Sequence, residues 1–145
     1  MLLGTVLTAA AIAAQVADYS IAPVAAGSWT YQALPGGSEA RFIDTTNTAR
    51  LMIRCTKMSR QVNISHTSAI AAASLLVWTS SASRTVPARF EPNAMRVTAD
   101  FSAFDPLLDA IAFSRGRLVV TMAGGVPLVA PAWPEAARTI EDCRI

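Results

Sequence analysis

The stretch from Asp105 to Met122, DPLLDAIAFSRGRLVVTM, constrains the fold most, because it contains start and stop signals for a helix followed by the pattern of a strand. Its first residue is a good N-cap, and Pro106 suits the first helical position, where its missing N–H is not needed. Gly116 can take the left-handed conformation that ends a helix, so the pattern predicts a helix over about 105–114. After this glycine, apolar residues alternate with period two, which predicts a strand with a buried face. The helix is therefore expected to pack on a sheet.

Short segments with strand-like alternation, separated by polar turns, occupy most of the remaining chain. The other expected strands cover 28–33, 38–43, 49–55, 61–65, 75–79, 83–90, 95–101 and 126–130. Pro87 and Pro127 restrict their segments to sheet edges or bulges, because proline cannot donate to the ladder. Gly124 and Gly125 predict a two-residue hairpin.

A second helix is expected over about 134–143, since Pro134 and Glu135 favour a helix start. Many short antiparallel strands, one crossover helix and a C-terminal helix predict a mainly β (α+β) fold. The expected architecture is a single antiparallel β-sandwich or half-open barrel.

Composition narrows the class of protein. With 145 residues, 52% of them hydrophobic and 15% charged, the chain can bury one core and form one domain. Its 12 basic and 10 acidic residues are scattered, with a net charge of +2. A nucleic-acid-binding protein would be expected to carry a basic stripe, so this class is not favoured.

The amino terminus predicts export. Residues 1–14, MLLGTVLTAAAIAA, are apolar, too short to span a bilayer as a helix, and end in small residues that suit cleavage after Ala13 or Ala14. They resemble a secretory signal peptide, and an uncleaved apolar anchor or a translation start further upstream are the alternatives. We expect 15–27 to be a connecting arm, 28–145 to be the single β-rich domain, and no stable membrane span to remain after cleavage.

The two cysteines, Cys55 and Cys143, are expected to form one disulfide in an oxidising compartment. Each lies on the inward face of its predicted element. Two free buried thiols are the alternative, since free cysteine is common in protein cores.

No arrangement of residues indicates catalysis or a metal. His66 is the only histidine, so a Ser-His arrangement would have to use it with Ser65 or Ser68, and we interpret it as a solvated turn histidine. One histidine and two distant cysteines do not make a zinc site. We therefore expect no enzyme activity, no catalytic residue, no metal and no cofactor.

The segment Ser114-Arg115-Gly116-Arg117 is the candidate binding site. Arg115 and Arg117 flank a glycine at a helix-to-strand junction, where an anionic ligand or a carboxylate could be bound bidentately. The alternative is that these are solvated arginines that pair with Asp109 or another surface acid, which contributes little to stability.

Four short sequences carry a resemblance to a group of known proteins: W-x-Y near the start, R-L-M-I-R-C, G-R-L-V-V-T and the closing E-D-C-R. In layout, residues 29–144 resemble small periplasmic accessory proteins of proteobacteria, of the type VI secretion-associated and invasion-associated locus B kinds. The resemblance implies an all-β or β-rich domain without catalysis. The chain lacks the additional cysteine of the second group.

These features favour a non-enzymatic domain, periplasmic or secreted in a bacterium, that binds another envelope or secreted protein. An alternative is a periplasmic inhibitor or a binder of a small anion at Arg115 and Arg117. A third hypothesis is a hydrolase that uses His66 and a nearby serine.

Overall fold

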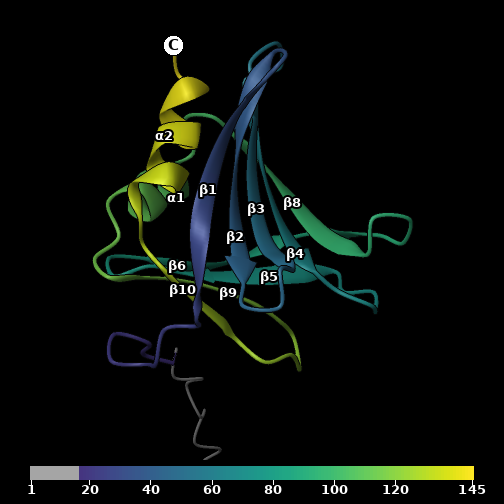
Figure 1. Cartoon of the computed structure of the whole chain (residues 1–145), viewed down its shortest axis with the longest axis vertical. Coiled ribbons are helices and arrows are strands. Elements are labelled where there is room, and N and C mark those ends of the chain that lie inside the picture. The colour runs from purple at the N-terminus through teal and green to yellow at the C-terminus, as the bar shows by residue number, and fades with distance from the viewer. Residues whose placement is uncertain (1–16) are drawn as a thin grey trace, which may run out of the picture.

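The structure is a computed structural model, and it describes residues 17–145; the expected signal peptide lies outside the described residues. Two antiparallel sheets and two helices make up the domain (Figure 1). The strands are β1 (Gly27–Leu34), β2 (Gly37–Asp44), β3 (Ala49–Thr56), β4 (Gln61–Thr67), β5 (Ser74–Trp78), β6 (Ser83–Pro87), β7 (Arg89–Glu91), β8 (Arg96–Ser102), β9 (Arg117–Met122) and β10 (Leu128–Pro131). The helices are α1 (Pro106–Ala112) and α2 (Pro134–Asp142). The predicted mainly β, sandwich-like fold is confirmed.

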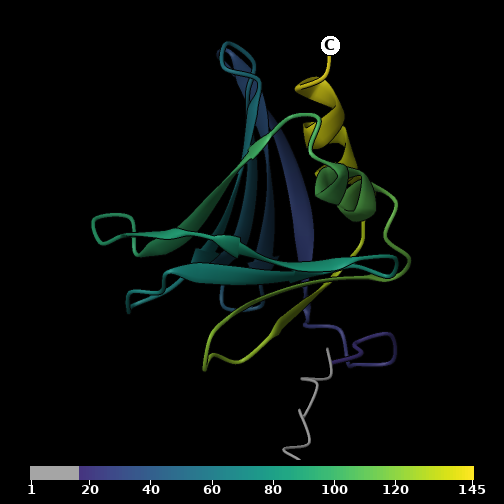
Figure 2. The ribbon, with the colours of Figure 1, turned by 180° about the vertical axis from the view of Figure 1, so that it is seen from behind.

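Sheet A has the strand order β1-β2-β3-β4-β8-β7, and sheet B has the order β10-β9-β5-β6. The strands of sheet A stand upright in Figures 1 and 2, while those of sheet B lie across one end of them. The expected edge positions are confirmed, because β6 with Pro87 and β10 are the two edges of sheet B. Between β6 and β7 the chain passes from the edge of sheet B to the edge of sheet A.

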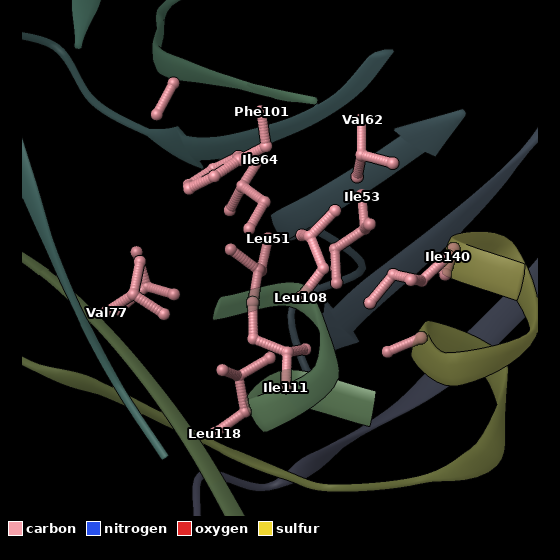
Figure 3. Packing of buried hydrophobic residues seen from close by; sticks show 14 of the residues in the cluster. Leu51, Ile53, Val62, Ile64, Val77, Phe101, Leu108, Ile111, Leu118 and Ile140 are labelled. Atoms are coloured by element: carbon pink, nitrogen blue, oxygen red, sulfur yellow. The ribbon is translucent and has the colours of Figure 1, made fainter. Parts of the chain in front are cut away.

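The core lies between the two sheets and the helices (Figure 3). Strand alternation accounts for it, because the inward residues of each strand are apolar and almost wholly buried. Its largest fully buried apolar side chains are Phe42, Leu51, Ile53, Ile64, Leu75, Leu108, Leu118 and Ile140.

Both helices start as their sequences predict. Asp105 caps α1, since its side chain accepts a hydrogen bond of 2.8 Å from the backbone N–H of Leu107. Helix α2 begins at Pro134 and packs against α1 and strands β1 to β3. The disulfide between Cys55 and Cys143 is present, with 5.5 Å between the two Cα atoms, and it joins β3 to the residue that follows α2.

The described part of the arm, residues 17–26, packs on the outer face of sheet B. The ring of Tyr19 meets that of Trp78 edge-on, and the N–H of Ala25 donates to the carbonyl of Val129 at 2.8 Å. Val119 lies in the same small cluster, which explains why β9 is buried on both of its faces.

Two sequence predictions about glycines were wrong in detail. Helix α1 ends at Ala112 with Phe113 as its C-cap, so Gly116, although its φ is +75°, belongs to the loop before β9. The hairpin between β9 and β10 uses residues 123–127 rather than Gly124 and Gly125 alone, because strand pairing starts only at Leu128.

Candidate functional site

The residues of the sequence-predicted binding site do not come together as one cluster. Arg115 is exposed, and its backbone N–H donates to the hydroxyl of Ser80. The Nε atom of Arg117 donates to the carbonyl of Ala22 in the arm at 2.7 Å, so this side chain holds the arm. Asp109 pairs instead with Arg144, at 2.5 Å from its Nη1 atom. Binding of an anion at this corner stays a prediction.

The prediction that His66 is a solvated turn residue was wrong. His66 lies within β4, is only 3% exposed, and sits in register with Leu51 and Val97, whose side chains are in the core. Its Nδ1 atom donates to the carbonyl of Thr67 at 2.7 Å, which leaves Nε2 buried and unpartnered among the described residues. The alternation of β4 was visible in the sequence, but the strand was expected to end at Ser65, whereas it continues through His66 to Thr67.

Neither candidate serine partners this histidine in the part of the chain that the structure describes. The side chain of Ser65 lies on the opposite face of β4, where its hydroxyl accepts from Thr98, and the hydroxyl of Ser68 donates to the carbonyl of Ile70. Within residues 17–145, no group of three or more His, Cys, Asp or Glu side chains is placed to hold a metal ion.

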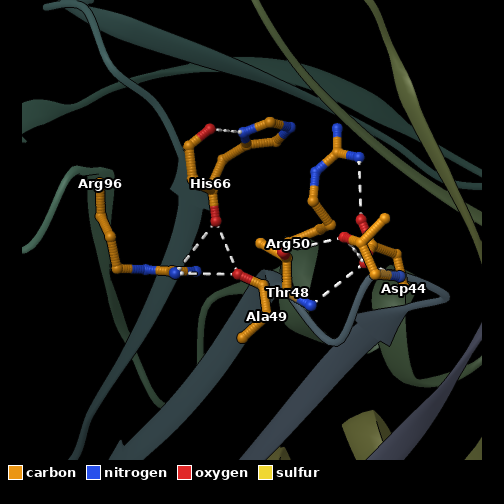
Figure 4. Close-up of polar contacts among 8 residues, drawn as sticks. Asp44, Thr48, Ala49, Arg50, His66 and Arg96 are labelled. Carbon is orange, nitrogen blue, oxygen red and sulfur yellow. Dashed lines mark hydrogen bonds and ion pairs between the residues drawn. The ribbon is translucent and has the colours of Figure 1, made fainter.

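The environment of His66 predicts a pH-dependent stability. Burial lowers the pKa of His66 below its usual value near 6.5, and the positive charges of Arg50 and Arg96 lower it further (Figure 4). His66 therefore takes up a proton more readily in the unfolded chain than in the folded chain. The free energy of unfolding falls as the pH drops below about 6.5. The slope is at most about 1.4 kcal/mol per pH unit for one proton, and it levels off below the folded pKa. Urea unfolding between pH 7.5 and 5 measures it, and a His66→Gln variant with the same slope would contradict the assignment.

A different polar site lies on the outer face of sheet A, opposite the core. We call it the sheet A hollow; it has a volume of about 360 Å³. Its lining residues come from β3, β4, β7, β8 and the turn before β8: Met52, Arg54, Asn63, Ser65, Arg89, Glu91, Ala94, Arg96 and Thr98. Several outward-facing side chains are buried there, since Thr98 is 4% exposed and Arg96 is 9% exposed. Long arginine side chains line the hollow around them.

Alternation along the expected strand 95–101 places Arg96 and Thr98 on the face opposite Val97 and Phe101, which the register confirms, but nothing in the sequence indicates that they are buried. Their neighbours across the sheet, Thr67 and Ser65, belong to a strand about thirty residues earlier in the chain. Only the strand order β3-β4-β8 brings these polar side chains together. The only hint of this site in the sequence was that the expected strands 49–55, 61–65 and 95–101 each carry polar residues at outward positions.

The four sheet edges differ in protection. Strand β6 carries Arg84 and Pro87, β7 has only three residues, and β10 is bonded to the arm through Val129. Strand β1, in contrast, is eight residues long, GSWTYQAL, with no charge, no proline and an unbroken register with β2. Among residues 17–145, no backbone hydrogen bond joins its outer edge to another segment. Its exposed edge runs along one margin of sheet A (Figure 1).

Comparisons with protein-family models, with curated proteins and with solved structures each found no match to this chain. Residues 17–145 contain no helix long and apolar enough to cross a membrane.

Proposed function

We propose that this protein is a non-enzymatic, exported domain that binds another envelope or secreted protein by strand addition at β1. In this mode an extended segment of the partner pairs with the free edge of a sheet, and main-chain hydrogen bonds provide much of the affinity.

The observation that carries this proposal is the contrast between β1 and the other edges. Unprotected edge strands are prone to pair with other chains, so proteins usually shorten them, charge them, interrupt them with proline or cover them. The edges formed by β6, β7 and β10 each have at least one of these features. Strand β1 has eight residues and neither charge nor proline, and although α2 packs against its core side, no backbone hydrogen bond within residues 17–145 occupies its outer edge.

Two further observations support export and a specific partner. The Cys55–Cys143 disulfide suits an oxidising compartment such as the periplasm. On the core side of β1, the guanidinium of Arg138 lies 3.8 Å from the ring of Tyr31. Arg138 is exposed and forms no ion pair within the described range, so it favours a partner strand with an acidic residue at this position.

The test compares two edges with the same substitution chemistry. Thr30→Lys with Gln32→Lys places two charges on the exposed face of β1, and Ser83→Lys with Thr85→Lys does the same on β6. We expect the β1 pair to reduce cross-linked partner from an envelope fraction by about tenfold, equivalent to about 1.4 kcal/mol, while the β6 pair changes little.

Equal capture by both variants would overturn the proposal. It would also be overturned if size-exclusion chromatography with light scattering gave a dimer of this chain that only the β1 lysines dissociate, because the strand would then pair with a second copy.

A further inference from the structure

We propose that the sheet A hollow binds a small carboxylate ligand with a short aliphatic part, and that Arg96 is the residue that receives the carboxylate. This site is separate from the proposed β1 interface, because its lining strands β3, β4, β8 and β7 leave out both β1 and β2. Its volume of about 360 Å³ is within the range of small-molecule sites.

Most of the charge around the hollow is already compensated. Glu39, which is 1% exposed, lies between Arg41 and Arg54 and is paired with both. At the other end, Arg89 pairs with Glu91 at 3.0 Å and with Asp100. Of these groups, Arg54, Arg89 and Glu91 line the hollow, and each already has a partner of opposite charge.

Arg96 is the exception, because its buried guanidinium contacts only uncharged oxygens within residues 17–145. Nη1 donates to the carbonyl of Ala49 at 3.1 Å (Figure 4) and to the hydroxyl of Thr67 at 3.2 Å. Nη2 donates to the carbonyl of Ser65 at 2.9 Å. Its Nε atom is buried without a partner among the residues described. Glu39 and Glu91 attract Arg96 without forming an ion pair with it, so an anion that reaches the buried guanidinium gains a strong, charge-assisted interaction.

The floor beside Arg96 offers a second donor. The hydroxyl of Thr98 donates to that of Ser65 at 3.1 Å, so the hydroxyl hydrogen of Ser65 is available to a ligand. A single unpaired guanidinium and one hydroxyl match the two oxygens and single charge of a carboxylate better than a phosphate dianion. Met52 and Ala94 provide an apolar wall, which accounts for the aliphatic part.

The test uses butyrate as the probe, with butyramide as its neutral isostere and inorganic phosphate as a competing anion. In ¹⁵N-labelled protein we expect butyrate to shift amide signals of residues 63–65 and 96–98 saturably, and butyramide to shift none of them. Ser65→Ala and Arg96→Gln should weaken butyrate binding by about tenfold or more, as expected for the loss of a charge-assisted hydrogen bond.

Arg60→Gln is the matched control, because Arg60 is an exposed arginine that does not line the hollow, and the change should leave butyrate binding unchanged. Because the wild-type shifts are read without any variant, a poorly folded Arg96→Gln protein does not decide the result. Absence of saturable shifts, equal shifts with butyramide, stronger binding of phosphate, or shifts centred on residues 115–117 would each overturn the proposal. Capture of a protein partner through β1 is a separate measurement, so the two proposals can fail independently.

Discussion

Replacing Cys143 by serine is expected to lower the melting temperature by more than about 8 °C. The Cys55–Cys143 bond closes a loop with a sequence separation of 88 residues, and on the chain-entropy model its loss costs about 4 to 5 kcal/mol. A domain of this size loses about 2 to 4 °C for each kcal/mol. Both sulfurs are buried, and the bond anchors the end of α2 to β3, so α2 should separate first. Calorimetry of the disulfide-bonded wild-type protein and of the Cys143→Ser variant measures the difference.

The control for this prediction is the double variant in which both cysteines are serine. It should melt close to the Cys143→Ser protein, because either change breaks the same bond. Alkylation of denatured, unreduced wild-type protein should label neither cysteine. Two freely alkylated thiols in protein recovered from a bacterial envelope would contradict the disulfide there and weaken the proposal of export.

Much of the fold could be predicted from local patterns. Period-two alternation located the strands, and the Asp105 cap located the start of α1, because these signals act over a few residues. The disulfide was predicted from the inward positions of its cysteines and from the signal-like amino terminus. The order of strands in the two sheets could not be predicted in this way, because it depends on pairings between distant segments.

The candidate sites depend on the order of the strands in the two sheets, which could not be predicted from local patterns. Arg96 resembles an ordinary outward arginine in the sequence. It becomes unusual only because β4 pairs with β8 and β3 pairs with β4, which places Ser65, Thr67 and Ala49 around its guanidinium. His66 was predicted to be a turn residue, because the expected strand ended just before it, whereas β4 includes it and turns its side chain into the core. Arg117 was predicted to face solvent or a ligand, but its side chain donates a hydrogen bond to the carbonyl of Ala22 in the arm instead. In each case the deciding neighbour lies about 15 to 95 residues away in sequence.

The unprotected state of β1 is likewise a property of the assembled sheet. Its sequence has no charge, which would be ordinary for a strand in the middle of a sheet. It becomes notable only because β1 is the terminal strand, with β2 as its sole ladder partner in the described part of the chain. An edge strand without charges was therefore not visible as a binding surface before the strand order was known.

The glycine pair at the turn between β1 and β2 gives the second large effect. A Cβ atom at Gly37 would lie 1.9 Å from the carbonyl oxygen of Cys55, so Gly37→Ala must push β2 away from β3 beside the disulfide. We expect a loss of about 3 kcal/mol or more in urea unfolding, as for severe overpacking. Its neighbour Gly36 has a φ of +78° but open space around it, so Gly36→Ala should lose only about 1 to 2 kcal/mol from left-handed strain. Equal losses for the two variants would show that β2 and β3 are not held this closely.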